Sequence, residues 1–372
     1  MKTLYLKSLF LLALVTSGSL YGQSLAMDWQ KTIGGTDYET ADIVLMTPDH
    51  GFIFGSSSLS GISAYKSEPS YGGADYWIIK TDSAANVEWE TTIGGSGDDY
   101  LNYLSLTDDG GYILGGTSNS DISGVKTSNT IGPYGNPDAW VVKLNSTGHI
   151  EWQKVFGGGY DDFVGSINQT PDGGYILGAN KEQAGSFIYN YNVYKLNNIG
   201  TIEWQREYYA FWDDQLVRAI QSDDGGYLLC GYSNSDITGD KTEPMIDVTD
   251  FWIIKINSIG DIEWQNVIGG THFDNCVDAI KTADGGYLLA AESQSPAGYD
   301  KSENSIYYYD YWVVKINATG EVVWENTIQG NNLDYLRCII QAQDGGYMLG
   351  NDVRVFRQPG GWLRSSHPLK SA

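Results

Sequence analysis

The chain has 372 residues, of which 46 are acidic and 22 basic, so its formal net charge at pH 7 is −24. A field of this sign repels phosphate backbones and anionic lipid, which argues against nucleic acid and membrane surfaces as partners. The length exceeds what one simple core needs, but an internal repeat, rather than length, sets the domain count.

Residues 1–22 have the pattern of a secretory signal peptide. Lys2 and Lys7 supply the positive start, the apolar run Leu9–Val15 follows, and small residues lead to an expected cleavage after Gly22. The apolar run is too short to span a bilayer. We therefore expect a protein that is secreted or displayed at the cell surface, without a transmembrane segment.

Residues 23–350 repeat a unit of about sixty residues. Each full unit predicts four strands, A to D: a half-polar segment, an apolar segment after an Asp-Gly turn, a W-[VI]-[VI]-K run, and a segment with a second tryptophan. Asp-Gly between short apolar runs favours a tight hairpin because both residues tolerate positive φ. In the four intact copies the tryptophan pairs are Trp77 and Trp89, Trp140 and Trp152, Trp252 and Trp264, and Trp312 and Trp324.

Four antiparallel strands per unit, with no long stretch of helical period, predict an all-β fold of the β-propeller type. The C strands are apolar at consecutive positions, as expected if neighbouring blades cover both faces. The chain opens with an isolated D-like segment around Trp29 and ends with A-like and B-like segments in 333–350. We predict six blades, with the N-terminal strand completing the last blade.

Residues 351–372 depart from the repeat. From Val353 onward they hold four basic residues and no acidic one, in a chain that is otherwise strongly acidic. We expect this atypical tail to result from a truncation or a frameshift.

The phrases WQKTxGGxxDD, T-x-DGGY-[IL]-L and DYW-[IV]-[IV]-K resemble those of exported β-propeller proteins typical of Bacteroidota, over residues 27–350. The resemblance implies class and location, often with a C-terminal domain for type IX secretion, which we do not recognise in this sequence. The segment Asn145–Trp152 is also similar to the tryptophan-docking hairpin of quinoprotein propellers. The chain has no Cys-Cys pair of the kind those enzymes carry, so the likeness implies no pyrroloquinoline quinone.

Three cysteines, Cys230, Cys276 and Cys338, lie in predicted strands at unrelated repeat positions. An odd number in such positions argues against a disulfide framework, and we expect buried free thiols.

An acidic residue recurs at the start of each predicted A strand, which in a propeller would place a ring of carboxylates at one mouth of the central channel. One interpretation is a cation site or a polar funnel for a ligand. The alternative is that each carboxylate accepts N–H groups of its own D–A loop. The predicted ring consists of Glu39, Asp99, Asp162, Asp214, Asp274 and Asp334. No cofactor is expected, and calcium has no support from a stacked binding motif.

The B–C connections are long and rich in tyrosine, and they are expected to share a face with the D–A loops. Exposed aromatics beside polar groups suit sugar rings, although loop tyrosines also serve to pin loops to a scaffold. The candidate ligand-binding residues are Tyr65, Tyr71, Tyr134, Tyr189, Tyr191, Trp212, Tyr299, Tyr307, Tyr308 and Tyr309.

No catalytic motif occurs, so no catalytic residue is predicted. We predict a monomeric, non-catalytic binding or scaffold module, with a polysaccharide or a surface protein as its partner. The alternatives are a polysaccharide-cleaving glycoside hydrolase, whose paired acids would meet only in the fold, and a protein-interaction platform within a surface complex.

Overall fold

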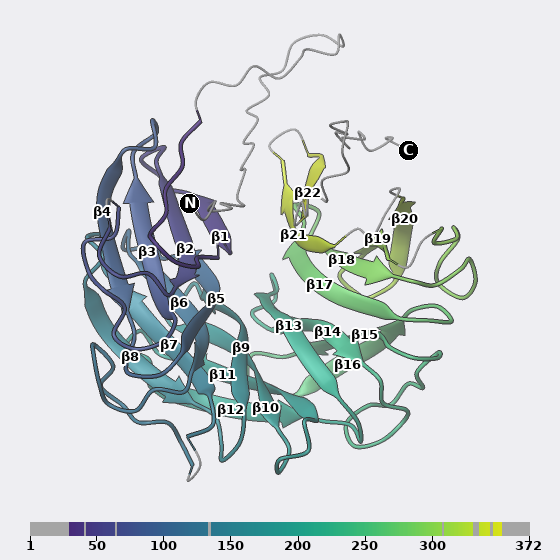
Figure 1. Ribbon diagram of the computed structural model, residues 1–372. Helices are drawn as coiled ribbons and strands as arrows, with labels where there is room; N and C mark the ends of the chain where they lie inside the picture. The colour runs from purple at the N-terminus through teal and green to yellow at the C-terminus, as the bar shows by residue number, and fades with distance from the viewer. Residues whose placement is uncertain are drawn as a thin grey trace, which may run out of the picture.

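The computed structural model describes residues 30–40, 42–63, 65–132, 135–306, 309–329, 335–342 and 345–351. Five sheets of four antiparallel strands follow one another along this part of the chain, and a sixth sheet of two strands ends it (Figure 1). The predicted β-propeller is thereby confirmed, and we number its blades I to VI. The D-like segment around Trp29 and the tail from residue 352 onward lie outside the described residues.

The strands of blades I to III are β1 (Ile43–Met46), β2 (Phe52–Ser58), β3 (Asp75–Thr81), β4 (Val87–Ile93), β5 (Asp99–Leu106), β6 (Tyr112–Ser118), β7 (Asp138–Leu144), β8 (Ile150–Phe156), β9 (Asp162–Gln169), β10 (Tyr175–Glu182), β11 (Tyr189–Leu196) and β12 (Ile202–Tyr208). Those of blades IV to VI are β13 (Asp214–Gln221), β14 (Tyr227–Ser233), β15 (Asp250–Ile256), β16 (Ile262–Ile268), β17 (Asp274–Lys281), β18 (Tyr287–Ser293), β19 (Asp310–Ile316), β20 (Val322–Ile328), β21 (Leu336–Gln341) and β22 (Tyr347–Asn351).

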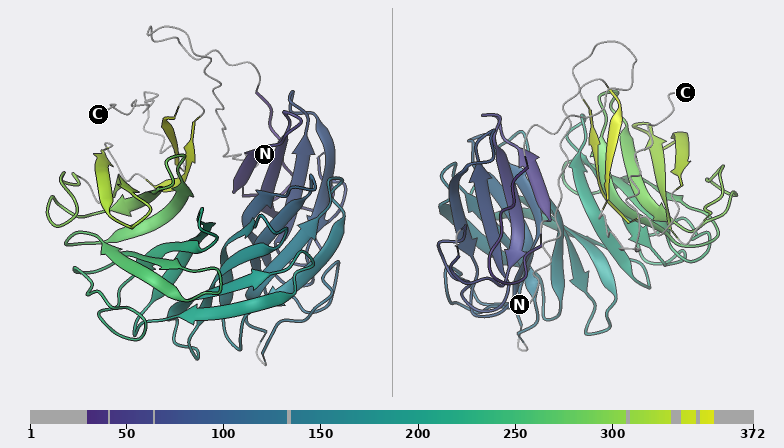
Figure 2. Two further views of the ribbon diagram at one scale, coloured as in Figure 1. Left: turned by 180° about the vertical axis from the view of Figure 1, so that it is seen from behind. Right: turned by 45° about the horizontal axis from the view of Figure 1, so that its top comes forward.

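The blades are arranged around a common centre (Figures 1 and 2). The first strands of successive blades from β5 to β21 lie toward the centre and contact one another, while the fourth strands form the rim. Between strands A and B the Asp-Gly turns place glycine at positive φ, as at Gly110 and Gly173, which both have φ of 80°. Local turn chemistry thus sets the hairpins, and packing of the first strands sets the ring.

The C strands form the buried core between blades. All seven residues are buried in each of β3, β7, β15 and β19. Trp140 of blade II packs against Tyr76 of blade I with ring centroids 5.1 Å apart, and its Nε1 donates to Gln153 Oε1 at 3.2 Å. Trp252 and Trp312 pack in the same way against Tyr191 and Phe251 of the preceding blades. These three tryptophans are therefore wedges between blades with a satisfied polar atom, as expected for a buried indole.

The second tryptophan docks onto the next blade. Trp152 Nε1 of blade II donates to Asn198 O of blade III at 3.2 Å, and Trp204 repeats this contact on Ser258 O at 3.0 Å. Gly200 sits under the Trp152 ring, because a Cβ at this position would lie 2.8 Å from the indole. The T-G-x-x-x-W pattern is thereby explained, because the tryptophan of one blade packs on the glycine of the same pattern in the next blade.

Candidate functional site

The four described aspartates of the predicted acidic ring cap their own D–A loops. Asp99 Oδ2 accepts the Gly95 N–H at 2.7 Å, and Asp274 Oδ2 accepts the Gly270 N–H in the same way at 2.7 Å. The equivalent donors are Gly158 to Asp162 and Ala210 to Asp214, while Glu39 accepts hydroxyls of Ser58 and Ser60.

The four aspartates of this set are buried, with at most 2% of their surface exposed. Of the two interpretations of the ring, the structure supports the second for these residues, because their carboxylates accept backbone N–H groups of the D–A loops. Asp334, the sixth predicted member, lies outside the described residues.

A second set of buried acids, at the start of the C strands, pairs with this first set across the blade junctions. The carboxyl groups of Asp75 and Asp99 are within hydrogen-bond reach of each other, as are those of Asp138 and Asp162. At least one Oδ1 atom in each pair of carboxyl groups accepts no hydrogen bond from the described residues. A proton shared between the two carboxyls would satisfy such an oxygen.

The titration of these pairs follows from their burial. Burial, opposed by the Tyr71 N–H and reinforced by the charge of Asp99, raises the pKa of Asp75 to about 7. Burial likewise raises the pKa of Asp138 and of Asp250 to about 7, each with the facing acid of the next blade adding to the effect. Burial at the blade junctions thus favours the protonated form of Asp75, Asp138 and Asp250.

Buried lysines compensate part of this negative charge, and the sequence analysis missed them. Lys126 Nζ donates to Ser118 Oγ and to Ser120 O, both at 2.6 Å, and lies 5.4 Å from the Trp140 ring centroid. The repeat could have revealed them, because each follows a serine of the B–C connection by six residues. These lysines are Lys66, Lys126, Lys241 and Lys301.

A polar network of described residues crosses the centre of the ring. Arg218 of β13 forms an ion pair with Asp278 of β17 at 2.6 Å, and its guanidinium lies 4.8 Å from the Tyr103 ring centroid of β5. Asp278 also accepts the Ile339 N–H of β21 at 2.8 Å. Side chains of blades II, IV and V and a backbone N–H of blade VI therefore meet across the middle of the molecule.

The predicted aromatic residues that the structure describes are spread over blades I, III and V. The B–C connections do lie against the D–A loops, as expected: Asp240 N donates to Tyr209 O at 2.9 Å. Tyr65, Tyr71, Tyr299 and Trp212 are exposed, and Tyr189 and Tyr309 are half-buried. Tyr134, Tyr307 and Tyr308 lie outside the described residues.

Tyr191 corrects the prediction of an exposed loop residue. It lies inside β11, is fully buried, and donates its hydroxyl to Trp252 O of blade IV at 3.1 Å. Tyr76 occupies the same place in blade I, with its hydroxyl 3.4 Å from Trp140 O. Tyr191 therefore belongs to the core between blades.

Blade III departs from the repeat at its junction with blade IV. At three described junctions the D–A loop begins with glycine, at Gly94, Gly157 and Gly269, and a Cβ there would overlap the carboxylate of the preceding C-strand aspartate. At the junction of blades III and IV, Asn190 replaces that aspartate and Tyr209 replaces the glycine. At the junction of blades V and VI the aspartate is kept as Asp310, and Gln329 stands at the glycine position. Among the described junctions, that of blades III and IV alone lacks both the acid and the glycine, and its D–A loop is aromatic.

Asn190 is buried near the start of β11 and belongs to a polar group of blade III. Its Nδ2 donates to Glu207 Oε1 at 2.7 Å, and its Oδ1 accepts from Gln183 Nε2 at 2.6 Å. Lys181 forms an ion pair with Glu207 at 3.0 Å. Together with Tyr209, residues 183, 190 and 207 line an open pocket with a volume of about 380 Å³.

The loop beside this pocket exposes three aromatic side chains. Tyr209, Phe211 and Trp212 are 49%, 64% and 53% exposed. The rings of Phe211 and Trp212 meet edge to face with centroids 5.0 Å apart. The loop is held from blade IV, since Phe211 N donates to Thr238 Oγ1 at 2.9 Å and Trp212 N to Ser235 Oγ at 2.8 Å.

We call these residues the blade III patch: Gln183, Asn190, Glu207, Tyr209, Phe211 and Trp212. The sequence analysis selected Trp212 only, although the break in the repeat at 209–212 was a signal for the others.

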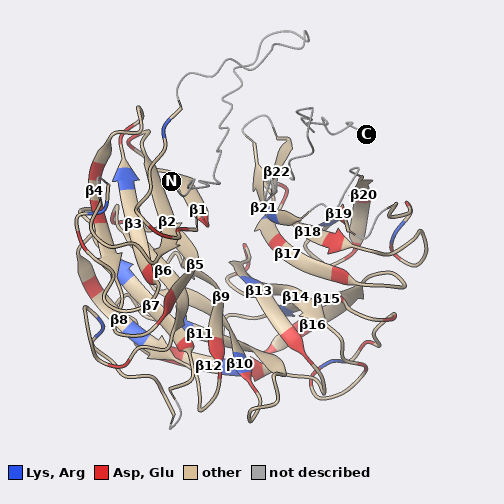
Figure 3. Ribbon diagram, in the orientation of Figure 1, with Lys and Arg blue, Asp and Glu red and all other residues tan. Residues whose placement is uncertain are grey.

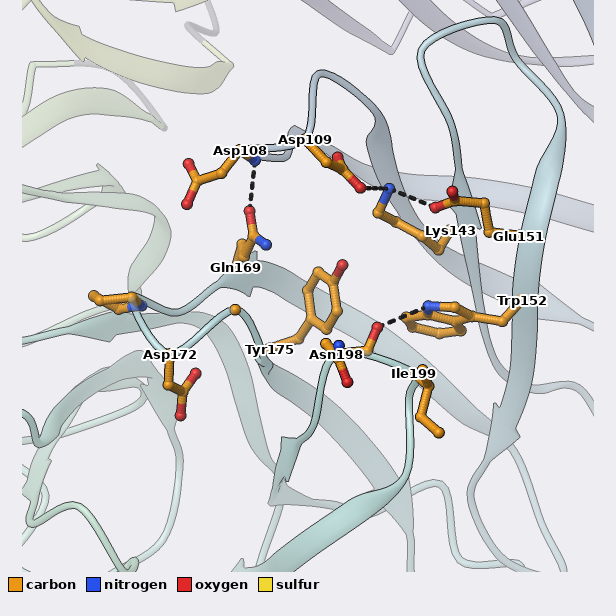
Figure 4. Close-up of a pocket in the computed structure, with 12 residues that line it drawn as sticks. Asp108, Asp109, Lys143, Glu151, Trp152, Gln169, Asp172, Tyr175, Asn198 and Ile199 are labelled. Atoms are coloured by element: carbon orange, nitrogen blue, oxygen red, sulfur yellow. Dashed lines mark hydrogen bonds and ion pairs between the residues drawn. The ribbon is translucent and has the colours of Figure 1, made fainter.

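A second pocket, of about 780 Å³, lies between blades II and III (Figure 4). Its walls are repeat elements: Lys143 bridges Asp109 at 2.8 Å and Glu151 at 2.9 Å, and Trp152 docks on Asn198. The same lysine bridge recurs in blade I, where Lys80 contacts Asp49 and Glu88. This pocket follows from the blade architecture.

The remaining features give no other candidate site. Acidic residues are spread over all the blades rather than gathered in one place (Figure 3). No group of three or more His, Cys, Asp or Glu side chains in the described part of the chain could hold a metal ion. Within the same residues no helix is long and apolar enough to cross a membrane.

No protein-family model matches the chain, and a search of curated proteins gave no match either. Solved structures with a similar fold include Kuenenia stuttgartiensis hydrazine synthase, with a TM-score of 0.49 and 15% identity over 85% of this chain and 74% of that one. A protein of unknown function from Dyadobacter fermentans has a TM-score of 0.48 and 9% identity, over 80% of this chain and 85% of that one. The Neurospora crassa Pan2 WD40 domain has a TM-score of 0.45 and 11% identity, over 83% and 85%. At this level of similarity these structures say nothing about a ligand of this chain.

Proposed function

We propose that the protein is an exported, non-catalytic binding module that takes up carbohydrate on the blade III patch. The observation that carries the proposal is the coupled replacement at the junction between blades III and IV. There the acid and the glycine that lie against each other at three other described junctions both give way, to Asn190 and an exposed aromatic loop. Replacing a buried contact between an acid and a glycine by exposed aromatic side chains does not improve packing. Exposed aromatic surface of this kind therefore favours a role in binding.

The chemistry of the patch suits a sugar. Trp212 and Phe211 offer apolar ring faces against which the C–H face of a pyranose can pack. The pocket beside them offers amide and carboxylate groups, and Lys181 offsets the charge of Glu207. A neutral polyol can exchange hydrogen bonds with such groups without the cost of burying a charge.

The proposed location follows from residues 1–22, whose pattern is that of a signal peptide. A strongly negative protein remains soluble outside the cell and is not attracted to anionic surfaces. A polysaccharide of the surroundings or of the cell surface is then the natural ligand.

The test uses the full chain after signal removal, incubated with a panel of insoluble polysaccharides. We expect depletion of protein from solution without release of reducing ends. Trp212→Ala and Phe211→Ala should weaken binding by roughly tenfold or more, as for other exposed aromatic anchors. Tyr299→Ala, which removes a similarly exposed ring from blade V, serves as the matched control and should bind normally.

Release of reducing ends would replace this proposal by a glycoside hydrolase. Absence of depletion from every polysaccharide would contradict it and favour a protein partner.

A further inference from the structure

Cys230 and Cys276 face each other across the junction of blades IV and V. Cys230 lies in β14 and Cys276 in β17, with 0% and 1% of their surfaces exposed. Their Sγ atoms are 3.0 Å apart. Non-bonded carbon atoms already prefer a separation of about 3.5–4.0 Å, so the two larger sulfur atoms are in unusually close contact.

The other blade junctions show what these two positions normally hold. Each has a small residue in strand B opposite a large aliphatic residue in strand A of the next blade. A Cβ on Gly115 would lie 2.7 Å from Val164 Cγ1, and one on Gly178 would lie 2.7 Å from Leu216 Cδ2. The remaining pairs are Gly55 with Leu101 and Ala290 with Leu336.

At the junction of blades IV and V both members of this small–large pair are cysteine. A single cysteine would be an ordinary replacement by a small apolar residue. Two cysteines at facing positions, 46 residues apart in the chain, bring their sulfur atoms into contact. Cysteine replaces both the small and the large residue at this junction. This double replacement points to a function of the cysteine pair beyond packing.

We propose that Cys230 and Cys276 form a disulfide that joins blades IV and V covalently and is made while the chain folds. A small disulfide such as oxidised glutathione is the oxidant. One protein thiolate attacks a sulfur of the oxidant and displaces a first glutathione thiolate. The second protein thiolate then attacks the protein sulfur of the mixed disulfide and displaces the second glutathione, so that two electrons pass to the oxidant and two thiol protons are released.

The burial of the pair decides when this reaction happens. A hydrogen bond to Cys276, together with burial, raises the pKa of Cys230, so the folded protein holds a thiol rather than the reactive thiolate. Oxidant and reductant also have no access to side chains that are fully buried. The bond therefore forms before blades IV and V close on each other, and it persists afterwards in the oxidising surroundings of an exported protein.

The test is to unfold the full chain in urea with reductant and to refold one half with reduced and oxidised glutathione and the other half with dithiothreitol. After the free thiols are alkylated, peptide mapping without reduction should show Cys230 and Cys276 linked in the first half, with Cys338 alkylated. The linked protein should weigh two hydrogen atoms less, and its urea midpoint should lie above that of the reduced protein. Dithiothreitol added to the folded, linked protein should leave the bond intact until urea is added.

The variant C230G/C276L restores the pair found at the other junctions, and its urea midpoint should not respond to reductant. The variant C338S removes the third thiol and should still form the link. Folded protein from the glutathione mixture with Cys230 and Cys276 both alkylated would overturn the proposal. So would a link to Cys338, or failure of C338S to refold under oxidising conditions when it refolds with dithiothreitol.

Discussion

Lys126 shows how a single buried charge is accommodated in this fold. Only 2% of its surface is exposed, yet its ammonium group is met by a serine hydroxyl, a carbonyl oxygen and the face of Trp140. Asp99 and Asp138 attract it from the two acid sets, while burial lowers its pKa. The lysine therefore ties the B–C connection of blade II to its acids and to its core.

Replacing Lys126 by methionine keeps the length of the side chain and removes the charge. We expect the free energy of unfolding to fall by about 3–5 kcal/mol, because buried acids lose their nearest cation. Urea denaturation followed by tryptophan fluorescence measures this loss. Lys154→Met is the matched control at an exposed lysine, and its effect should stay within about 0.5 kcal/mol. Equal stabilities of the two variants would show that Lys126 contributes no electrostatic stabilisation.

At the scale of elements, the C–D hairpin does two tasks at once. It reverses the chain through a glycine at positive φ, and it receives the tryptophan of the preceding blade. Gly200 has φ of 75° and lies against Trp152, whereas Gly225, in an A–B turn, has φ of 83° and no neighbour within 4 Å of an added Cβ. Substitution of Gly225 therefore introduces backbone strain alone, whereas substitution of Gly200 also introduces a clash with the Trp152 ring.

Gly225→Ala should lower the free energy of unfolding by about 1–2 kcal/mol, the cost of a left-handed alanine. Gly200→Ala carries this cost and should lose about 1–3 kcal/mol more, because the methyl group displaces the Trp152 ring. Urea denaturation of both variants gives the comparison. Equal losses would mean that the docked tryptophan adjusts without cost.

At the scale of the whole molecule, the carboxyl pairs make the stability of the blade junctions sensitive to pH. The pKa of Asp75, Asp138 and Asp250 is raised to about 7 from the ordinary value of 3.8. The folded chain then holds more protons than the unfolded chain between about pH 4 and pH 7. Stability from these groups is therefore fully present below pH 4 and is lost as the pH rises through 7.

Denaturation in urea at pH 5, 6, 7 and 8 should show unfolding free energy decreasing with pH, by about 1.4 kcal/mol per pH unit for each excess proton. Asp138→Asn replaces one acid by a group that cannot ionise and should reduce this slope. Asp108→Asn, at an exposed acid, should leave the slope unchanged. A free energy of unfolding that rises between pH 5 and pH 7 would contradict proton binding by the paired carboxyl groups of the folded chain.

Aspartates whose pKa is lowered, and not raised, affect stability in another pH range. The Asp109 carboxylate, bonded to Lys143, has its pKa lowered to about 2, and Asp172 is held at about 2 by Lys195 in the same manner. Their contribution is present above pH 4 and is lost only as the pH falls toward 2. The two kinds of acid thus affect stability in separate pH windows.

The candidate site was only partly predictable from the sequence. The exposed position of Trp212 and the shared face of the B–C and D–A loops follow from strand alternation. The burial of Tyr191 could not be predicted as easily, because its strand lost the tryptophan that identifies the other copies. Tyr209 and Asn190 are recognised as a joint replacement only in the fold, because the glycine equivalent to Tyr209 lies against a C-strand aspartate at three other junctions.

The amino-acid sequence by itself determined the hairpins, the strand order within each blade and the propeller class, because turn residues and apolar runs act over a few positions and recur at a fixed period. Tertiary structure alone decided which acids share a junction, which lysines lie under tryptophans and that Cys230 meets Cys276. These contacts join different blades or distant segments of one blade, and their geometry depends on how whole sheets pack. Burial then changes the chemistry of each group, as the raised pKa of Asp138 shows.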